Sequence, residues 1–127
     1  MGHQAEVVCV SCSFDGLLVA TGSMDSTAKL WYVENGTLAR TLAGHSAEIV
    51  SLHFNQAGTQ ILTGSFDSTC RIWNVASGKV CFVLQGHQAE ISGALFNFEG
   101  DRCVSSSMDR TLRIWNSRDG ACLGVLE

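Results

Sequence analysis

The sequence contains no proline and few charged or aromatic residues. Among its 127 residues, 16% are charged, 8% are aromatic and none is proline. The absence of proline excludes a proline-rich linker, and no stretch is dominated by serine, glycine or a block of like charges. Since 46% of the residues are hydrophobic, we expect an ordered, soluble protein without internal disorder.

Basic residues are also scarce. Only eight Lys and Arg residues are present, and the net charge is -4. A nucleic-acid-binding surface needs Lys and Arg gathered on one face, so nucleic acid is not expected as a partner. No apolar run approaches the roughly 18 residues of a membrane span, and the N-terminus lacks the pattern of a signal peptide. We therefore expect a cytoplasmic protein without a membrane partner.

One motif recurs three times at a constant spacing along the chain. Each copy opens with a Gly-His pair, at residues 2–3, 44–45 and 86–87. Each then has a turn sequence that ends in aspartate, at Asp25, Asp67 and Asp109, and a tryptophan, at Trp31, Trp73 and Trp115. A fixed period of this length, about 40 residues, indicates an array of structural units. The predicted units of this single array are residues 2–43, 44–85 and 86–127.

Within each repeat the residue pattern favours strands. In the second repeat, β-compatible segments occupy residues 48–54, 60–65, 69–75 and 79–84. Short turn sequences separate these segments, and no segment favours a helix of useful length. At the third turn of the other repeats, Asn35-Gly36 and Asp119-Gly120 suit a two-residue hairpin with left-handed backbone angles. The sequence therefore predicts an all-β fold of three four-stranded antiparallel sheets.

The six cysteines do not share the repeat. No two of them occupy the same position within their repeats, so we interpret them as small hydrophobic residues rather than a disulfide framework. Cys9 and Cys12 have the spacing C-x-x-C, but there is no second pair and no histidine at ligand spacing. No metal site is therefore expected. Asn35-Gly36-Thr37 matches a glycosylation sequon, which we interpret as a turn.

The whole chain resembles the WD-repeat (β-transducin-like) family of β-propellers. The resemblance rests on the Gly-His pair, the aspartate turn and the tryptophan, which all recur in phase. In that family, histidine, serine or threonine, aspartate and tryptophan form a buried hydrogen-bond network in each blade. The resemblance assigns these networks to His3, Thr21, Asp25 and Trp31; to His45, Thr63, Asp67 and Trp73; and to His87, Ser105, Asp109 and Trp115.

The same residue types occur in nucleophilic catalytic triads. An active site is normally built once, however, whereas a packing device is needed in every blade, so we interpret the networks as structural. The chain has no glycine-rich phosphate loop and no G-x-S-x-G motif, and we expect no catalytic residue, cofactor or metal. The family's aspartate after tryptophan is replaced by Tyr32, Asn74 and Asn116.

Two further positions repeat in phase and suggest a partner surface. A glutamate follows each Gly-His pair by the same short interval, at Glu6, Glu48 and Glu90, and a large apolar residue precedes each turn aspartate, at Met24, Phe66 and Met108. In the family, both positions reach the narrow face around the central channel. Methionine and phenylalanine beside carboxylates suit a peptide anchor, so we expect a protein partner with a basic, partly apolar segment. A solvated charge with local packing remains the alternative.

The closer likeness lies within the family. The phrases V-A-T-G-S-M-D-S-T-A-K-L-W, L-A-G-H-S-A-E-I-V-S-L and G-H-Q-A-E-I-S are similar to consecutive central blades of an adaptor that helps carry outer-arm dynein into cilia. This likeness implies a non-catalytic scaffold in dynein assembly and intraflagellar transport, located in the cytoplasm and the cilium.

Three blades do not close a conventional propeller ring of four to eight blades. The chain is therefore either a piece of a longer propeller, natural or engineered, or a protomer that completes its ring with copies of itself. For a protomer we expect a homodimer with six blades, with a nine-bladed trimer as the variant. Two other functions stay open: a self-assembling unit without its own cellular role, and an enzyme with its site on the propeller face.

Overall fold

The computed structural model describes residues 2–127, which form twelve strands and no helix. The strands are β1 (Val7–Cys12), β2 (Leu18–Ser23), β3 (Ala28–Tyr32), β4 (Leu38–Leu42), β5 (Ile49–Phe54), β6 (Gln60–Ser65), β7 (Cys70–Asn74), β8 (Val80–Leu84), β9 (Ile91–Phe96), β10 (Arg102–Ser107), β11 (Leu112–Asn116) and β12 (Cys122–Leu126). They pair antiparallel, in chain order, into three four-stranded sheets: β1–β4, β5–β8 and β9–β12. The predicted all-β fold class is confirmed.

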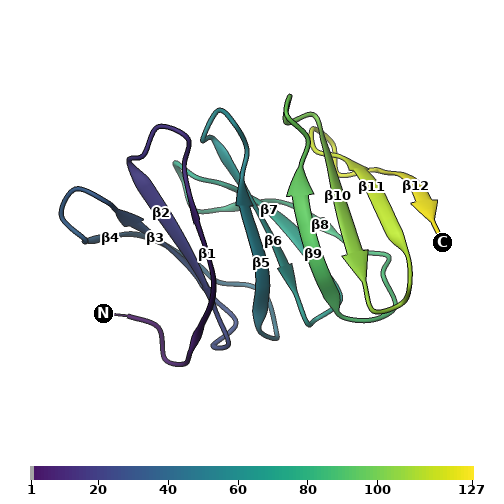
Figure 1. Cartoon of the computed structure of the whole chain (residues 1–127), viewed down its shortest axis with the longest axis horizontal. Coiled ribbons are helices and arrows are strands. Elements are labelled where there is room, and N and C mark those ends of the chain that lie inside the picture. Colours follow the sequence, from purple (N-terminus) through teal and green to yellow (C-terminus); the bar gives the residue numbers. More distant parts are fainter. Residues whose placement is uncertain (1) are drawn as a thin grey trace.

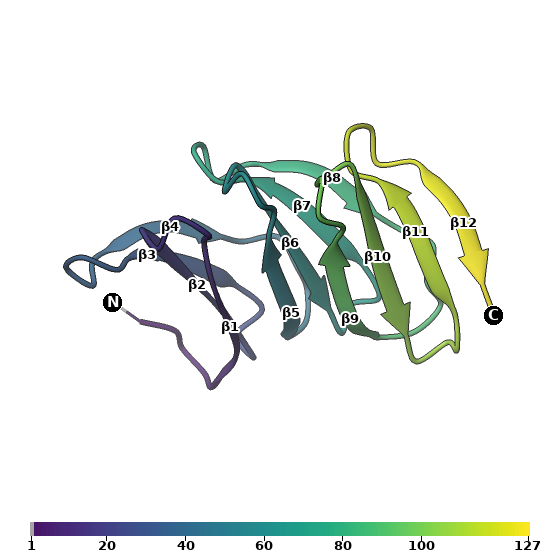
Figure 2. The same ribbon diagram turned by 45° about the horizontal axis from the view of Figure 1, so that its top comes forward.

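The three sheets stand side by side as blades, which we call the first, second and third blade in chain order (Figure 1). The opening strands β1, β5 and β9 are neighbours, so the blades approach one another along these strands. The N-terminus lies beside the first blade and the C-terminus beside the third, at opposite ends of the row (Figure 2). The second blade is therefore covered on both faces, and each outer blade on one.

Two hydrophobic clusters fill the two spaces between blades. The first joins Ala20, Ala28, Leu30 and Leu42 of the first blade to Leu52, Phe54, Ile61 and Trp73 of the second. The other joins Leu62, Cys70, Ile72 and Leu84 of the second blade to Ile91, Ala94, Phe96, Cys103 and Trp115 of the third. Since successive side chains of a strand point to opposite faces, neighbours such as Leu62 and Ile61 serve different clusters.

Two glycines set the distance between blades. A Cβ atom on Gly22 would lie 2.6 Å from Ile49 Cγ2, and one on Gly64 would lie 2.7 Å from Ile91 Cγ2. Neither position has room for a side chain, so β2 and β6 can approach the next blade only with glycine there. The third blade carries Ser106 at the equivalent position.

The third turn of each blade differs from the predicted two-residue hairpin. In the first blade, Gly36 N donates to Tyr32 O at 2.8 Å and Tyr32 N donates to Thr37 O at 2.9 Å. The turn therefore spans residues 33–36, and Gly36, not Asn35, has a positive φ, of 71°. Gly120 occupies the same position in the third blade, with a φ of 76°. A longer turn needs only one left-handed residue at its end, and glycine adopts that conformation without strain.

Candidate functional site

The four predicted network residues of the second blade form one continuous chain of hydrogen bonds. His45 Nδ1 lies 2.8 Å from Asp67 Oδ2, and His45 Nε2 lies 2.7 Å from Thr63 Oγ1. Because a carboxylate only accepts, Nδ1 carries the proton and donates to Asp67, and Nε2 accepts from the Thr63 hydroxyl. Trp73 Nε1 donates to the same hydroxyl oxygen at 2.9 Å. Each of the four polar side chains of this network therefore has a hydrogen-bond partner.

The other two blades repeat this geometry. In the first blade, His3 lies 3.0 Å from Asp25 Oδ2 and 2.7 Å from Thr21 Oγ1, which accepts from Trp31 Nε1 at 2.9 Å. In the third blade the corresponding distances among His87, Asp109, Ser105 and Trp115 are 3.0, 2.7 and 2.9 Å. The structure thus brings the predicted residues together as three sets, one in each blade.

Each network aspartate also holds the turn between the second and third strands of its blade. Asp67 Oδ2 accepts from Ser46 N at 3.0 Å, and Oδ1 accepts from Thr69 N at 2.9 Å and Thr69 Oγ1 at 2.6 Å. Burial raises the pKa of Asp67, but these hydrogen bonds and the one from His45 outweigh it and hold the pKa below the ordinary value. The carboxylate is therefore ionised at neutral pH.

Burial lowers the pKa of His45, although its contact with Asp67 acts in the opposite direction. The imidazole is therefore neutral at neutral pH, as its place between a carboxylate and a hydroxyl requires. The pKa of Asp109 is also low, chiefly because of the hydrogen bond from Thr111. For Asp25, burial is outweighed by hydrogen bonds from Thr27 and its neighbours, and its pKa is likewise well below the usual range.

Sequence reasoning missed two residues in each network. The threonine two positions after each aspartate donates to its carboxylate, at Thr27, Thr69 and Thr111. The serine two positions before it accepts from the aspartate's amide and donates to a carbonyl ahead of the first strand, at Ser23, Ser65 and Ser107. Both positions also recur in phase with the repeat, which is the signal that could have identified them.

The networks fit packing better than nucleophilic chemistry. The Thr63 hydroxyl accepts from Trp73 and donates to His45, and Thr63 has no exposed surface, so a substrate could not reach it.

Within residues 2–127, no three His, Cys, Asp or Glu side chains are grouped as metal ligands. All six cysteines are free thiols. No helix of the described chain is long and apolar enough to cross a membrane.

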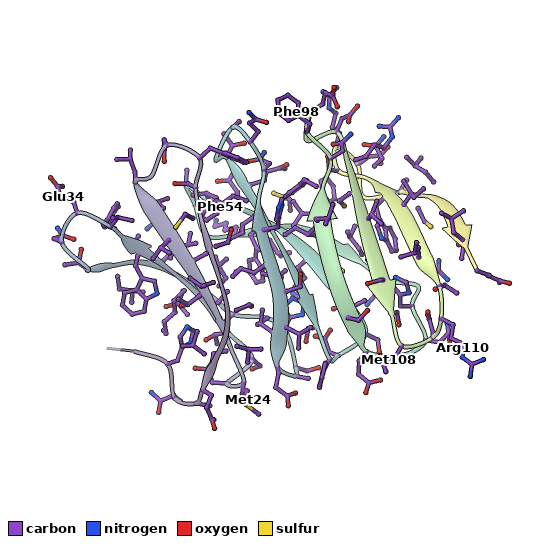
Figure 3. The ribbon with its side chains drawn as sticks, viewed as in Figure 1. Met24, Glu34, Phe54, Phe98, Met108 and Arg110 are labelled. Atoms are coloured by element: carbon purple, nitrogen blue, oxygen red, sulfur yellow. The ribbon has the colours of Figure 1, made fainter. Side chains whose placement is uncertain are left out.

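The six predicted partner-binding residues lie in pairs at one end of the blades. The amide of the apolar residue donates to the carbonyl of the glutamate in each blade: Met24 to Glu6 at 2.9 Å, Phe66 to Glu48 at 3.0 Å and Met108 to Glu90 at 2.9 Å. Met24, Phe66 and Met108 are 47%, 45% and 67% exposed. Figure 3 shows Met24 and Met108 at the same end of the molecule, opposite Phe98.

A shallow apolar cavity of about 150 Å³ joins part of this surface between the first and second blades. We call it the Glu48 cavity, and it is lined by Val8, Met24, Glu48, Val50 and Phe66. The pairing register shifts between Val7 and Cys9 and again between Ile49 and Ser51. These bulges take Val8 and Val50 out of the regular alternation of side chains, which is why the sequence pattern did not identify them.

The remaining predicted residues lie outside the Glu48 cavity. Glu6, Glu90 and Met108 are exposed at the same end of the first and third blades but do not line it. The predicted partner-binding residues therefore form three Glu-apolar pairs. Met24 of the first pair and both residues of the second, Glu48 and Phe66, line the Glu48 cavity.

Comparison with known proteins places these observations in a family. The family model "WD domain, G-beta repeat" matches residues 1–32, 36–74 and 78–116. The second match spans the outermost strand of the first blade and the first three strands of the second, and the third match is offset in the same way. One sequence repeat therefore joins two neighbouring blades.

Individual relatives match parts of larger proteins. Human WD repeat-containing protein 18 is 43% identical over 42 residues, which are 33% of this chain and 10% of that protein. Two solved structures, the crystal structure of the RRP9 WD40 repeats and the structure of U3-55K, superpose with a TM-score of 0.94 at 23% identity. They match 99% of this chain, which spans 40% of each of theirs. Since the family model covers most of the sequence, the chain belongs to the WD domain, G-beta repeat family, and its three sheets are WD40 propeller blades.

Proposed function

We propose that this chain is a non-catalytic scaffold that binds a basic, partly apolar segment of a partner protein at the Glu48 cavity. WD40 repeats generally serve as protein-interaction scaffolds. The observation that carries the proposal is that the cavity combines two exposed apolar side chains, Met24 and Phe66, with the carboxylate of Glu48. An apolar side chain of the partner would fill the cavity, and a neighbouring lysine or arginine would pair with Glu48.

The proposed cellular setting is the assembly of outer-arm dynein and its intraflagellar transport. Its support is the sequence likeness to central blades of an adaptor with that role. In ciliated cells, a tagged chain should then be found in the cytoplasm and along the cilium and should co-purify with outer-arm dynein components. A tagged chain confined to the nucleus, or one that never co-purifies with dynein components, would contradict this setting.

The binding site is tested with two substitutions in folded protein. The ligand is a purified dynein-assembly component that binds the parent chain. Glu48→Lys should slow association and reduce its salt dependence, whereas Phe66→Ala should speed dissociation. Glu34→Lys, on an exposed turn residue outside the Glu48 cavity, is the matched control. Unchanged affinity and salt dependence in both variants would place the site on another face.

We also propose that two copies complete a six-bladed ring. The outer flank of the first blade and that of the third would meet twice, and the four flanks would bury about 1,200 Å², near the low end for a specific interface. At the new joint, a smaller side chain on one flank would face a larger side chain on the other. Val7 stands where the inner joints have Ile49 and Ile91, and it would meet Ser106 in place of glycine.

Side-chain sizes at further positions of this joint also complement one another. Cys12 takes the place of Phe54, while the opposing flank carries Val104 and Leu112 where the first blade has alanines. Light scattering at micromolar concentration should return twice the chain mass of 13.6 kDa. A mass three times that of the chain would favour the nine-bladed ring. A stable monomer would exclude self-closure and favour coverage of the flanks by blades of other sequence.

A further inference from the structure

A second exposed apolar surface lies at the end of the blades opposite the Glu48 cavity. It is formed at the first turn of each blade, at residues 13–16, 55–58 and 97–100. Phe14 and Phe98 hold equivalent positions in the first and third turns and are 68% and 76% exposed. Figure 3 shows Phe98 at this end, away from Met24 and Met108.

The two phenylalanines border one cavity of about 80 Å³ that receives residues from all three blades. Its wall also contains His53 of the second blade and Phe96 of the third, whose rings lie 6.4 Å apart between centroids. We call this site the phenylalanine cavity. Single exposed phenylalanines are common on protein surfaces, but aromatic rings from separate blades around one hollow form a patch of the kind that binds partners.

A polar group at the cavity wall lacks a partner. His53 Nδ1 is buried and has no hydrogen bond among the described residues. Buried polar atoms are almost always paired, so this nitrogen is an exception among the side chains that line the cavity. Burial also lowers the pKa of His53, so that the ring is neutral at neutral pH.

The charged side chains of the three first turns are acidic. Among the residues of the three turns, Asp15 and Glu99 are the only charged side chains, and each directly follows one of the exposed phenylalanines. Next to the third turn, Arg102 Nη1 lies 3.6 Å from Asp101 Oδ2, so these two opposite charges offset one another. A cationic group beside an apolar anchor therefore matches this surface, whereas an acidic segment would be repelled.

We propose that the phenylalanine cavity is a second docking site, for a protein segment in which an aromatic or leucine side chain is flanked by lysine or arginine. The apolar side chain enters between Phe14 and Phe98, and the flanking cation pairs with Asp15 or Glu99. Since this site and the Glu48 cavity lie at opposite ends of the blades, one chain could hold two segments at once. The proposal does not depend on binding at the Glu48 cavity.

A random phage-displayed peptide library, selected on the full chain, tests the proposal. Enriched peptides are synthesised, and their affinities are measured by calorimetry for the parent, for Phe98→Ser and for Val80→Ser. We expect peptides with an apolar residue beside lysine or arginine, and a loss of about tenfold or more with Phe98→Ser. Val80→Ser, at an exposed apolar residue of β8 outside both cavities, should leave the affinity unchanged. No enrichment, enrichment of acidic peptides, or equal loss in both variants would overturn the proposal.

Two controls distinguish the loss of the phenylalanine anchor from an effect of charge and from unfolding of the variant. Asp15→Lys with Glu99→Lys should weaken the same peptides and reduce their dependence on salt. In the parent protein labelled at phenylalanine rings, bound peptide should shift the signals of Phe14, Phe96 and Phe98. This measurement needs no variant, so it decides even if Phe98→Ser unfolds. Shifts confined to Phe66 would place the peptides at the other end and reject the phenylalanine cavity.

Discussion

The first and second blades share one backbone plan and one hydrogen-bond network, but they differ in what covers them. Trp73 of the second blade is 2% exposed because side chains of the first blade, including Ala20 and Leu30, pack in the same cluster. Trp31 of the first blade makes the same hydrogen bond to a threonine, yet it lies in an open hollow beside Val19. A blade's network depends on its own sequence, whereas its burial depends on its neighbour.

This difference predicts unequal stability along the row of blades. In repeat proteins, stability is approximately a sum of the terms within each repeat and the terms between neighbours. The first and second blades should therefore respond similarly to changes inside a network and differently to changes on the covered face. The following substitutions separate the two kinds of term.

The largest difference is expected at the position shared by Phe54 and Cys12. Phe54 is 2% exposed between two blades, and Phe54→Ala should cost about 3–5 kcal/mol of unfolding free energy because it leaves a cavity. Cys12 is exposed in the single chain, so in the monomer Cys12→Ala should cost less than about 0.5 kcal/mol, as is usual at surface sites. Denaturant unfolding of both variants measures this difference. A loss for Cys12→Ala clearly above the range of surface sites would mean that the first blade's outer flank is covered in solution, as self-closure requires.

The next effect concerns the networks. Asp67→Ala leaves His45 and the amides of Ser46 and Thr69 without their acceptor, and should cost about 2–4 kcal/mol. Asp25→Ala removes the equivalent bonds next to an open flank, where water can replace them more easily, and should cost less. Thermal unfolding followed by circular dichroism compares the two. If Asp67→Ala melts within a degree or two of the parent, the central network does not stabilise the fold.

A smaller effect is expected from the spacing of the blades. Gly64→Ala puts a Cβ atom 2.7 Å from Ile91 Cγ2 and should cost about 1–3 kcal/mol through overpacking. Ser106→Ala, at the equivalent position on the flank of the third blade that is open in the single chain, should stay within about 0.5 kcal/mol of the parent in the monomer. Both are read from the midpoint of urea unfolding. A neutral Gly64→Ala would show that the blades can separate without loss.

The smallest effect is the dependence of stability on pH. Burial lowers the pKa of His45 and of His53 in the folded chain, so below about pH 6.5 the unfolded chain takes up protons first. Stability should therefore decrease from pH 7 to pH 5, as the histidines of the unfolded chain become protonated before those of the folded chain. His53→Gln should make this decrease shallower. A further loss below about pH 4 should follow from Asp67, whose folded pKa is depressed.

The sequence determined the features whose contacts lie within a single repeat. The network partners lie 10 to 22 residues apart within one repeat, and the same spacing recurs in every repeat, so the resemblance to the family assigned His45, Thr63, Asp67 and Trp73 by their positions. The strands could likewise be predicted, because alternation of side chains and short turns are local properties. Local context was insufficient at the third turn, where hydrogen bonding rather than the Asn-Gly pair selects the left-handed residue.

Only the tertiary structure decided which of these residues are covered and where they form a concave surface. Trp31 and Trp73 occupy the same place in their repeats, yet the exposure of each follows from the presence or absence of a neighbouring blade. The phenylalanine cavity brings Phe14 and Phe98 together from the first and third blades. Such sites require contacts between residues far apart in the sequence, and one repeat carries no information on the distance between blades, which packing of side chains such as Ile49 against Gly22 sets.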